Sequence, residues 1–250
     1  MNPVRSAPNG CTVKVVARQI NRDSSTVFRG LIRSITSNGM NQIKDKILIT
    51  GGRGFIGSAL NSYLGAKGYE IREFNGEIGN VETLEPYFKD IKWVIHLAAK
   101  TSNNSTRREP SDYFDVNLYG TLNVIRLCLK YDCRLIYFSS TEALIKRDDY
   151  GMSKALAEEL IEYHAAKYNL KAVTIRPCGI YGPDDPDNNR YIIRRYPLTK
   201  LCQDVADIIS KYNFDRYRVY STKLFVHKIY PIKLKLHLIK KFIKSKLFKI

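Results

Sequence analysis

Short apolar segments alternate with longer helical patterns from residue 46 to residue 176, and this alternation limits the fold more than any other feature of the chain. Candidate strands occupy residues 46–50, 70–74, 92–96, 134–139 and 171–176, and candidate helices occupy residues 55–67, 82–89, 112–131 and 151–168. Strands that alternate with helices form a parallel sheet with helices on both faces. The sequence therefore predicts an α/β fold with a doubly wound parallel sheet.

Glycines stand at positions 51, 54 and 57, where the first strand must turn into the first helix. Without a Cβ, backbone N–H groups and a helix N-terminus can approach a pyrophosphate closely. Tight turns also need glycine, but here an apolar strand precedes the glycines and an amphipathic helix follows them. The pattern predicts a Rossmann-like dinucleotide site formed by Gly51, Gly52, Arg53, Gly54, Phe55, Ile56 and Gly57.

Six motifs in order between residues 46 and 183 resemble the extended short-chain dehydrogenase/reductase family of the NAD-dependent epimerase/dehydratase type. The first is the glycine spacing G-x-x-G-x-x-G, and the others are HLAA at 96–99, NLYGT at 117–121, SST at 139–141, YGMSK at 150–154 and RPCGIYGP at 176–183. The resemblance implies an enzyme that uses NAD or NADP on a nucleotide-sugar or related small-molecule substrate. It also implies cofactor contacts from Leu97, Ala98, Ala99, Asn117 and Pro177.

The same resemblance implies that Thr141, Tyr150 and Lys154 form the catalytic set, with Tyr150 and Lys154 also at the cofactor. Tyr150 and Lys154 are four residues apart on a predicted helix, so their side chains project from one face. A nearby ammonium favours the phenolate, which makes Tyr150 the candidate general acid/base. Lys154 would also hold the nicotinamide ribose, and Thr141 would hydrogen-bond the substrate oxygen. The alternative is an ordinary solvated pair on a helix, and we expect His96 to be a satisfied core histidine.

Two positions depart from the family near the adenosine end of the cofactor. Asn75 stands where the family has an acid for the adenosine ribose, and Glu77, followed by Ile78, stands where the family usually has Asp followed by an apolar residue near the adenine. Without a carboxylate at Asn75, a 2′-phosphate meets less repulsion, and Arg53 could reach such a phosphate. The choice between NAD and NADP therefore stays open, with a slight preference for NADP.

Further departures concern the substrate side. Only nine positions separate Thr141 from Tyr150, where relatives have a longer loop, and Asp148 and Asp149 would raise the pKa of Tyr150 if they approach it. Only 67 residues follow Pro183, so we expect a truncated C-terminal substrate region. Epimerase, dehydratase and reductase all stay open. The alternative function is a catalytically inactive or truncated dinucleotide-binding protein.

The net charge of +17 is carried by the two ends of the chain: residues 1–39 contribute +5, residues 191–250 contribute +12, and the residues between them are neutral. We expect a poorly ordered N-terminal extension at 1–39, an NAD(P)-binding domain at 40–183 and a short basic C-terminal region at 184–250. The neutral centre argues against a nucleic-acid groove. The last segment is either a solvated tail or a basic amphipathic helix for a membrane surface, with Leu236, Ile239, Ile243 and Leu247 on one side.

Five cysteines without a paired C-x-x-C pattern predict neither a metal site nor a disulfide framework. A reducing, cytoplasmic setting fits this cysteine content best. No apolar run reaches the roughly 18 residues that a membrane-spanning helix needs. The family resemblance additionally implies a homodimer formed through the predicted helices at 112–131 and 151–168.

Overall fold

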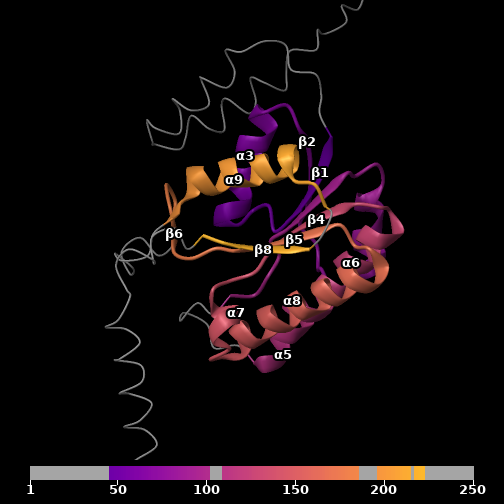
Figure 1. The fold of residues 1–250 in the computed structure, drawn as a ribbon, viewed down its shortest axis with the longest axis vertical. Coiled ribbons are helices and arrows are strands. Elements are labelled where there is room, and N and C mark those ends of the chain that lie inside the picture. The colour runs from indigo at the N-terminus through magenta and orange to yellow at the C-terminus, as the bar shows by residue number, and fades with distance from the viewer. Residues whose placement is uncertain (1–44, 102–108, 186–195, 215–216, 223–250) are drawn as a thin grey trace, which may run out of the picture.

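The computed structural model describes residues 45–101, 109–185, 196–214 and 217–222 (Figure 1). The predicted N-terminal extension at 1–39 and the basic amphipathic segment that contains Leu236, Ile239, Ile243 and Leu247 lie outside the described residues. So does most of the acidic and amide-rich loop that follows Pro183.

Six parallel strands form the central sheet. They are β1 (Lys46–Thr50), β2 (Glu70–Phe74), β3 (Trp93–His96), β4 (Arg134–Phe138), β5 (Ala172–Arg176) and β8 (Arg218–Ser221), in the order β2-β1-β3-β4-β5-β8. The inner strands are nearly continuous runs of buried Val, Ile and Leu because both faces of the sheet are covered. The predicted doubly wound, Rossmann-like fold is confirmed. The strand order reverses between β1 and β3, and ligands of such sheets bind beyond the carboxyl ends of the strands at that point.

Helices cover both faces of the sheet (Figure 1). One face packs against α3 (Phe55–Ala66) and α9 (Leu198–Lys211), and the other packs against α6 (Gly120–Lys130) and α8 (Asp149–Tyr168). Shorter elements complete the second layer: α4 (Val81–Leu84), the 3-10 helix η1 (Glu85–Phe88), α5 (Pro110–Tyr113), the π-helix η2 (Phe114–Tyr119) and α7 (Glu142–Ile145). The helix predicted at 112–131 is therefore three consecutive segments.

The sheet domain extends beyond the boundary that we placed at Pro183. Strand β8 pairs with β5 over four residues, with Thr174 opposite Val219. Helix α9 buries Leu201 and Val205 completely against the same core as α3. A small second sheet pairs β6 (Ile180–Tyr181) with β7 (Tyr196–Pro197) just before α9. The composition shift after Pro183 suggested a boundary, but the apolar residues of α9 recur at helical spacing and cover the sheet.

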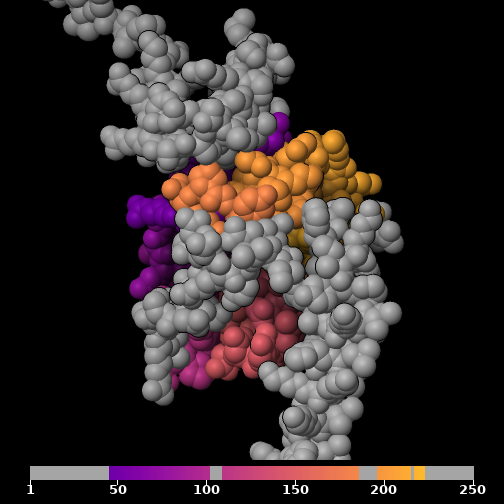
Figure 2. Space-filling view, turned by 90° about the vertical axis from the view of Figure 1, so that its left-hand side faces the viewer, coloured from indigo at the N-terminus to yellow at the C-terminus, as the bar shows by residue number. Residues whose placement is uncertain are grey.

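The carboxyl ends of the strands share one edge with the starts of α3, α7 and α8. Figure 2 shows one side of the molecule, where indigo to violet residues of the N-terminal part, the red region that includes α7 and α8 and the orange to gold region that includes α9 lie on one face. The predicted site residues after β1, β3, β4 and β5 are consequently gathered at this edge, although up to 126 positions separate them in sequence.

Candidate dinucleotide and proton-transfer site

The glycine turn between β1 and α3 leaves no room for side chains. Gly51 has a φ of +75°, and a Cβ on it would lie 2.7 Å from the backbone nitrogen of Ala98. A Cβ on Gly57 would overlap the carbonyl oxygen of Gly51, and the Gly54 N–H donates to that same oxygen at 3.1 Å. The ends of β1 and β3 and the first turn of α3 therefore touch backbone to backbone.

Helix α3 presents a free N-terminus at this turn. Gly54 is the N-cap residue, has no side-chain cap, and is followed by a first turn without an acidic residue. Arg53 is exposed, whereas Phe55 and Ile56 pack partly against the core. The uncapped N–H groups and the positive end of the helix dipole suit an anionic group such as a pyrophosphate.

Glu73 is a carboxylate at this turn that the sequence analysis missed. A Cβ on Gly52 would lie 2.9 Å from Glu73 Oε2, so the carboxylate rests directly against the glycine turn. The side-chain amide of Asn61 on α3 donates to one carboxylate oxygen, and that of Asn75 donates to the other at 3.4 Å. Residues 73 and 75 lie on the same face of the strand because side chains alternate, and this periodicity was the available signal.

The other predicted cofactor residues differ in their exposure and in their distance from the glycine turn along the chain. Leu97, Ala98 and Ala99 continue from β3 along the carboxyl edge and are partly buried, and Pro177 follows β5 at the same edge. Glu77 is exposed. Ile78 is only 4% exposed and packs against Gly120, so its side chain is part of the hydrophobic core.

Asn117 is buried and occupied by protein partners. Its side-chain oxygen accepts from the Lys100 N–H at 2.8 Å, and its amide donates to the Lys100 carbonyl and to the Ser153 hydroxyl, both at 3.0 Å. Ser153 in turn donates to the Tyr150 carbonyl at 2.8 Å. The resemblance implied a cofactor contact from Asn117, whereas here this residue ties η2 to the chain after β3 and to the start of α8.

His96 is a fully buried core residue with both ring nitrogens hydrogen-bonded, in agreement with the expectation. Nδ1 lies 2.7 Å from the Thr50 hydroxyl, and Nε2 lies 3.0 Å from the Thr121 hydroxyl. Burial and, secondly, the nearby charge of Lys154 lower the pKa of His96 to about 3. The folded protein therefore keeps this imidazole neutral.

The neutral His96 predicts a pH dependence of stability. An unfolded chain protonates the imidazole near its ordinary pKa of about 6.5, whereas the folded chain resists protonation down to about pH 3. The free energy of unfolding should therefore fall as the pH drops through this window, with a slope of up to about one proton from this group. His96→Gln should flatten that slope in denaturant titrations between pH 6.5 and pH 4. An unchanged slope would contradict the assignment.

Tyr150 lies at the start of α8 with its side chain at the carboxyl edge. The nearby Ser140 hydroxyl acts on its phenol and by itself lowers its pKa; Ser140 is another site residue that the sequence analysis did not select, although it belongs to the same SST stretch as Thr141. Thr141 is the N-cap residue of α7. Burial, with smaller contributions from Glu142 and Asp148, raises the pKa of Tyr150, so the phenol is neutral here.

Lys154 lies one helical turn beyond Tyr150 and is only 3% exposed. Its ammonium donates to the Phe138 carbonyl at 2.8 Å and lies 4.9 Å from the centre of the Tyr137 ring. Burial lowers the pKa of Lys154 to about 7, and the charge of Glu158 partly opposes this effect. The ammonium is thus held at the end of β4, next to the point where Ser139 and Ser140 follow the strand. The Ser139 hydroxyl is buried and has no hydrogen-bond partner among the described residues.

The short interval between Thr141 and Tyr150 folds into a tight junction. Lys146 ends α7 with a left-handed φ of +50°, and Asp148 caps α8 by accepting from the Gly151 N–H at 2.8 Å. A Cβ on Gly151 would lie 2.7 Å from the Glu142 carbonyl oxygen. Asp148 is therefore engaged as a helix cap while its charge still acts on Tyr150.

Within the described ranges, no three His, Cys, Asp or Glu side chains are placed to hold a metal ion, and the four described cysteines are free. No helix in the same ranges is long and apolar enough to cross a membrane.

Residues 47–197, more than half of the chain, match the profile of the NAD dependent epimerase/dehydratase family. The chain belongs to this family. The match confirms the resemblance that rested on the six motifs, and it includes the glycine turn, the SST stretch and the Tyr150/Lys154 pair.

Among curated proteins, a putative UDP-glucose 4-epimerase of Methanocaldococcus jannaschii is 27% identical over 65% of this chain and 65% of its own length. Among solved structures, UDP-glucose 4-epimerase of Thermus thermophilus in complex with NAD has a TM-score of 0.61 at 21% identity, covering 70% of this chain and 76% of that one. A dTDP-4-dehydrorhamnose reductase of Bacillus anthracis in complex with NADP has a TM-score of 0.60 at 20% identity, covering 73% of this chain and 76% of that one.

The curated relatives that this family member matches are longer than the matched part. The chain spans 65% of the first relative and 52% of a bifunctional UDP-glucose and UDP-xylose 4-epimerase of Arabidopsis thaliana. The likeness to the solved structures establishes the fold of the chain.

Proposed function

We propose that this chain binds NAD or NADP at the glycine turn and catalyses an oxidoreduction at a carbon of a nucleotide-sugar. One observation carries the proposal: the ends of β1 and β3 and the uncapped start of α3 meet without intervening side chains at Gly51, Gly54 and Gly57. This is the shape and polarity that a pyrophosphate requires. The unpartnered Ser139 hydroxyl at the same edge adds a polar group for a ligand.

In this reaction, each residue of the site has a separate role. The bound dinucleotide would accept or return a hydride. Tyr150 donates a proton to the substrate oxygen as a neutral phenol and takes one back in the reverse direction. Lys154 supports the negative charge on Tyr150 and hydrogen-bonds the nicotinamide ribose. Ser140 orients the Tyr150 hydroxyl, and Thr141 offers a second hydroxyl to the substrate.

The substrate class rests on the names of the relatives, which include UDP-glucose 4-epimerases and a dTDP-D-glucose 4,6-dehydratase. Epimerisation, dehydration and reduction all begin with the same proton and hydride positions. Glu142 directly follows Thr141 in the sequence, and a carboxylate next to this threonine could serve as an additional base. We therefore assign the class of substrate and leave these three outcomes open.

A second candidate function is dinucleotide binding without turnover. The tight junction between α7 and α8 favours it, because the Glu142 carbonyl packs directly on Gly151 where relatives have a longer loop. The raised pKa of Tyr150 also favours it, because this phenol gives up its proton reluctantly.

Titration of the purified full chain with NADH and NADPH, followed by nucleotide fluorescence, tests the proposal. We expect micromolar binding and a preference for the NAD form, because Glu73 holds a carboxylate against Gly52 that repels a 2′-phosphate. Glu73→Gln should narrow the difference between the two nucleotides, and Arg53→Ala should leave the preference for NAD intact. This expectation reverses the slight preference for NADP suggested by Asn75 alone.

The outcomes separate the two candidate functions. Binding of either nucleotide, together with oxidation or interconversion of a UDP- or dTDP-sugar, supports the enzyme. Binding without conversion of any sugar nucleotide supports the second candidate. A folded chain that binds neither nucleotide at millimolar concentration contradicts both.

The predicted homodimer also stays a prediction. Its proposed surfaces on η2, α6 and α8 expose several large side chains, with exposed fractions of 59% for Tyr119, 37% for Met152 and 48% for Tyr163. We propose that a second copy of the chain covers them, and sedimentation of the full chain measures whether it does.

A further inference from the structure

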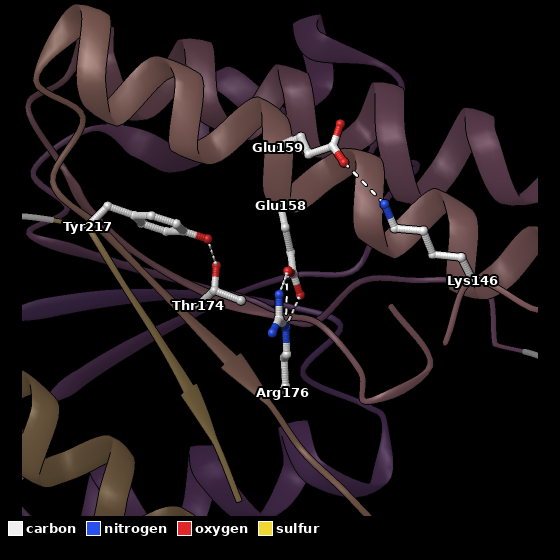
Figure 3. Close-up of polar contacts among 6 residues, drawn as sticks. All are labelled: Lys146, Glu158, Glu159, Thr174, Arg176 and Tyr217. Atoms are coloured by element: carbon white, nitrogen blue, oxygen red, sulfur yellow. Dashed lines mark hydrogen bonds and ion pairs between the residues drawn. The ribbon is translucent and has the colours of Figure 1, made fainter. Parts of the chain in front are cut away.

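An ion pair between a buried carboxylate and a partly buried guanidinium lies one helical turn beyond Lys154. Glu158 is on the same face of α8 as Tyr150 and Lys154 and is only 7% exposed. Arg176, the last residue of β5, donates to its carboxylate through Nε at 2.8 and 3.0 Å and also through a terminal nitrogen (Figure 3). Both carboxylate oxygens are therefore engaged by one guanidinium, which fixes the carboxylate toward β5.

Lys154 does not join this pair. Its ammonium donates to the Phe138 carbonyl on β4, and no ion pair between Lys154 and Glu158 occurs in the described part of the chain. The Glu158 charge nevertheless acts on Lys154 and raises its pKa against the effect of burial. A buried ammonium without any nearby carboxylate is strongly disfavoured, whereas a free carboxylate would pair with it directly.

We propose that Glu158 and Arg176 are positioning residues for Lys154. The arginine holds the carboxylate where it supports the ammonium through space, and by occupying both oxygens it keeps the carboxylate from drawing the ammonium away from the carboxyl end of β4. The link from this arrangement to cofactor binding rests on the proposed function. The effect of the pair on the charge state of Lys154 does not depend on that function.

Groups from several elements face Lys154 and its neighbour Glu158. They are His96 on β3, Tyr137 on β4, Tyr150 and Glu158 on α8, Arg176 on β5 and Tyr217 just before β8. His96 is neutral, and burial keeps the phenols of Tyr137 and Tyr217 neutral because it raises the pKa of each. Tyr217 is in addition hydrogen-bonded to Thr174 at 2.7 Å (Figure 3). Glu158 and Arg176 are thus the permanent charges among these groups.

The experiment is a pH titration of the Lys154 side-chain nitrogen and ε-carbon by NMR, on the isotope-labelled full chain, with the signal assigned by its absence in Lys154→Met. We expect Glu158→Gln to lower the titration midpoint of Lys154, because the supporting charge is lost while Arg176 remains. We expect Arg176→Met to raise the midpoint, because the full charge of Glu158 becomes available. If the ion pair only held α8 against β5, the Lys154 midpoint would move in the same direction in both variants or would not move in either. Either result overturns the proposal.

Glu159 provides a matched control. It is the next residue on α8, points away from Arg176 toward Lys146 and pairs with Lys146 at 3.3 Å at the surface (Figure 3). Glu159→Gln removes one carboxylate and one ion pair from the same turn, and it should leave the Lys154 midpoint unchanged. A shift as large as that of Glu158→Gln would overturn the proposal.

A conservative variant guards against loss of the fold. Arg176→Lys keeps a positive charge but loses the two-point contact with the carboxylate. We expect it to raise the Lys154 midpoint by less than Arg176→Met does, and an unchanged midpoint would contradict the role of the two-point contact. If Arg176→Met does not fold, the comparison uses Arg176→Lys instead. The proposal then requires a higher Lys154 midpoint in Arg176→Lys and a lower one in Glu158→Gln.

NADH titrations from pH 6 to pH 9 then test the functional link. Affinity should decline as Lys154 loses its proton, at a lower pH in Glu158→Gln and at a higher pH in Arg176→Met than in the unaltered chain. Opposite NMR shifts with no NADH binding in any variant would retain the positioning role and contradict the proposed function. Normal binding with no NMR shift would retain the function and overturn the positioning role.

Discussion

Gly57→Ala is expected to reduce dinucleotide affinity by at least about 100-fold, equivalent to roughly 2.7 kcal/mol. The new methyl group overlaps the Gly51 carbonyl oxygen and approaches the backbone of Gly52, so the turn must open and the start of α3 must move. Overpacking of this kind also costs about 1–3 kcal/mol of stability. Fluorescence titration with NADH and denaturant unfolding measure the two effects separately.

Gly65→Ala is the matched control within the same helix. A Cβ on Gly65 has nothing within 4 Å, so the added methyl group meets no atom. This variant should bind NADH like the unaltered chain, and its unfolding free energy should rise by up to about 1 kcal/mol because alanine favours the helical backbone. Equal NADH affinity in Gly57→Ala and Gly65→Ala would show that the glycine turn is not the nucleotide site.

Tyr150→Phe is expected to lower turnover of a sugar nucleotide by about 10²–10⁴-fold while NADH affinity changes little. The phenyl ring keeps the packing at the start of α8 but removes the phenolic proton. The measurement is single-turnover reduction of the bound nucleotide at saturating substrate, followed at the absorbance of the reduced nicotinamide.

Tyr113→Phe supplies the comparison for this variant. The Tyr113 ring lies 6.3 Å from that of Tyr150 between centroids, on the neighbouring helix α5. The Tyr113→Phe substitution removes a phenolic hydroxyl from this adjacent ring. If Tyr150 alone transfers the proton, turnover should stay within about threefold of that of the unaltered chain. Equal losses in both variants would mean that the hydroxyls act through packing rather than through proton transfer.

Much of the site was predictable because the motifs are local. The spacing of Gly51, Gly54 and Gly57 expresses a steric requirement of one turn, and the structure shows that requirement in backbone contacts. The four-residue spacing of Tyr150 and Lys154 places both on one face of a helix whatever surrounds it. Ser140 and Glu73 were missed because their roles depend on which neighbour they touch: Tyr150 in one case, and Gly52 and Asn61 in the other.

The end of the domain could not be located from composition. Residues after Pro183 carry many charges, and that average hid the apolar face of α9, where Leu201, Cys202 and Val205 are fully buried. A strand as short as β8 has little sequence signal of its own. It forms because β5 offers an open edge of backbone donors and acceptors next to it.

By itself, the sequence determined the order of the main strands and helices up to residue 176, the parallel sheet and the glycine turn, because periodicity and the absence of a Cβ act over a few residues. Only the tertiary structure decided the electrostatics of the site. The Lys154 ammonium is buried against the Phe138 carbonyl on β4, and the Glu158 carboxylate is held by Arg176 on β5. These charges meet across three elements, and the energy of a buried charge depends on the partners that the fold brings to it.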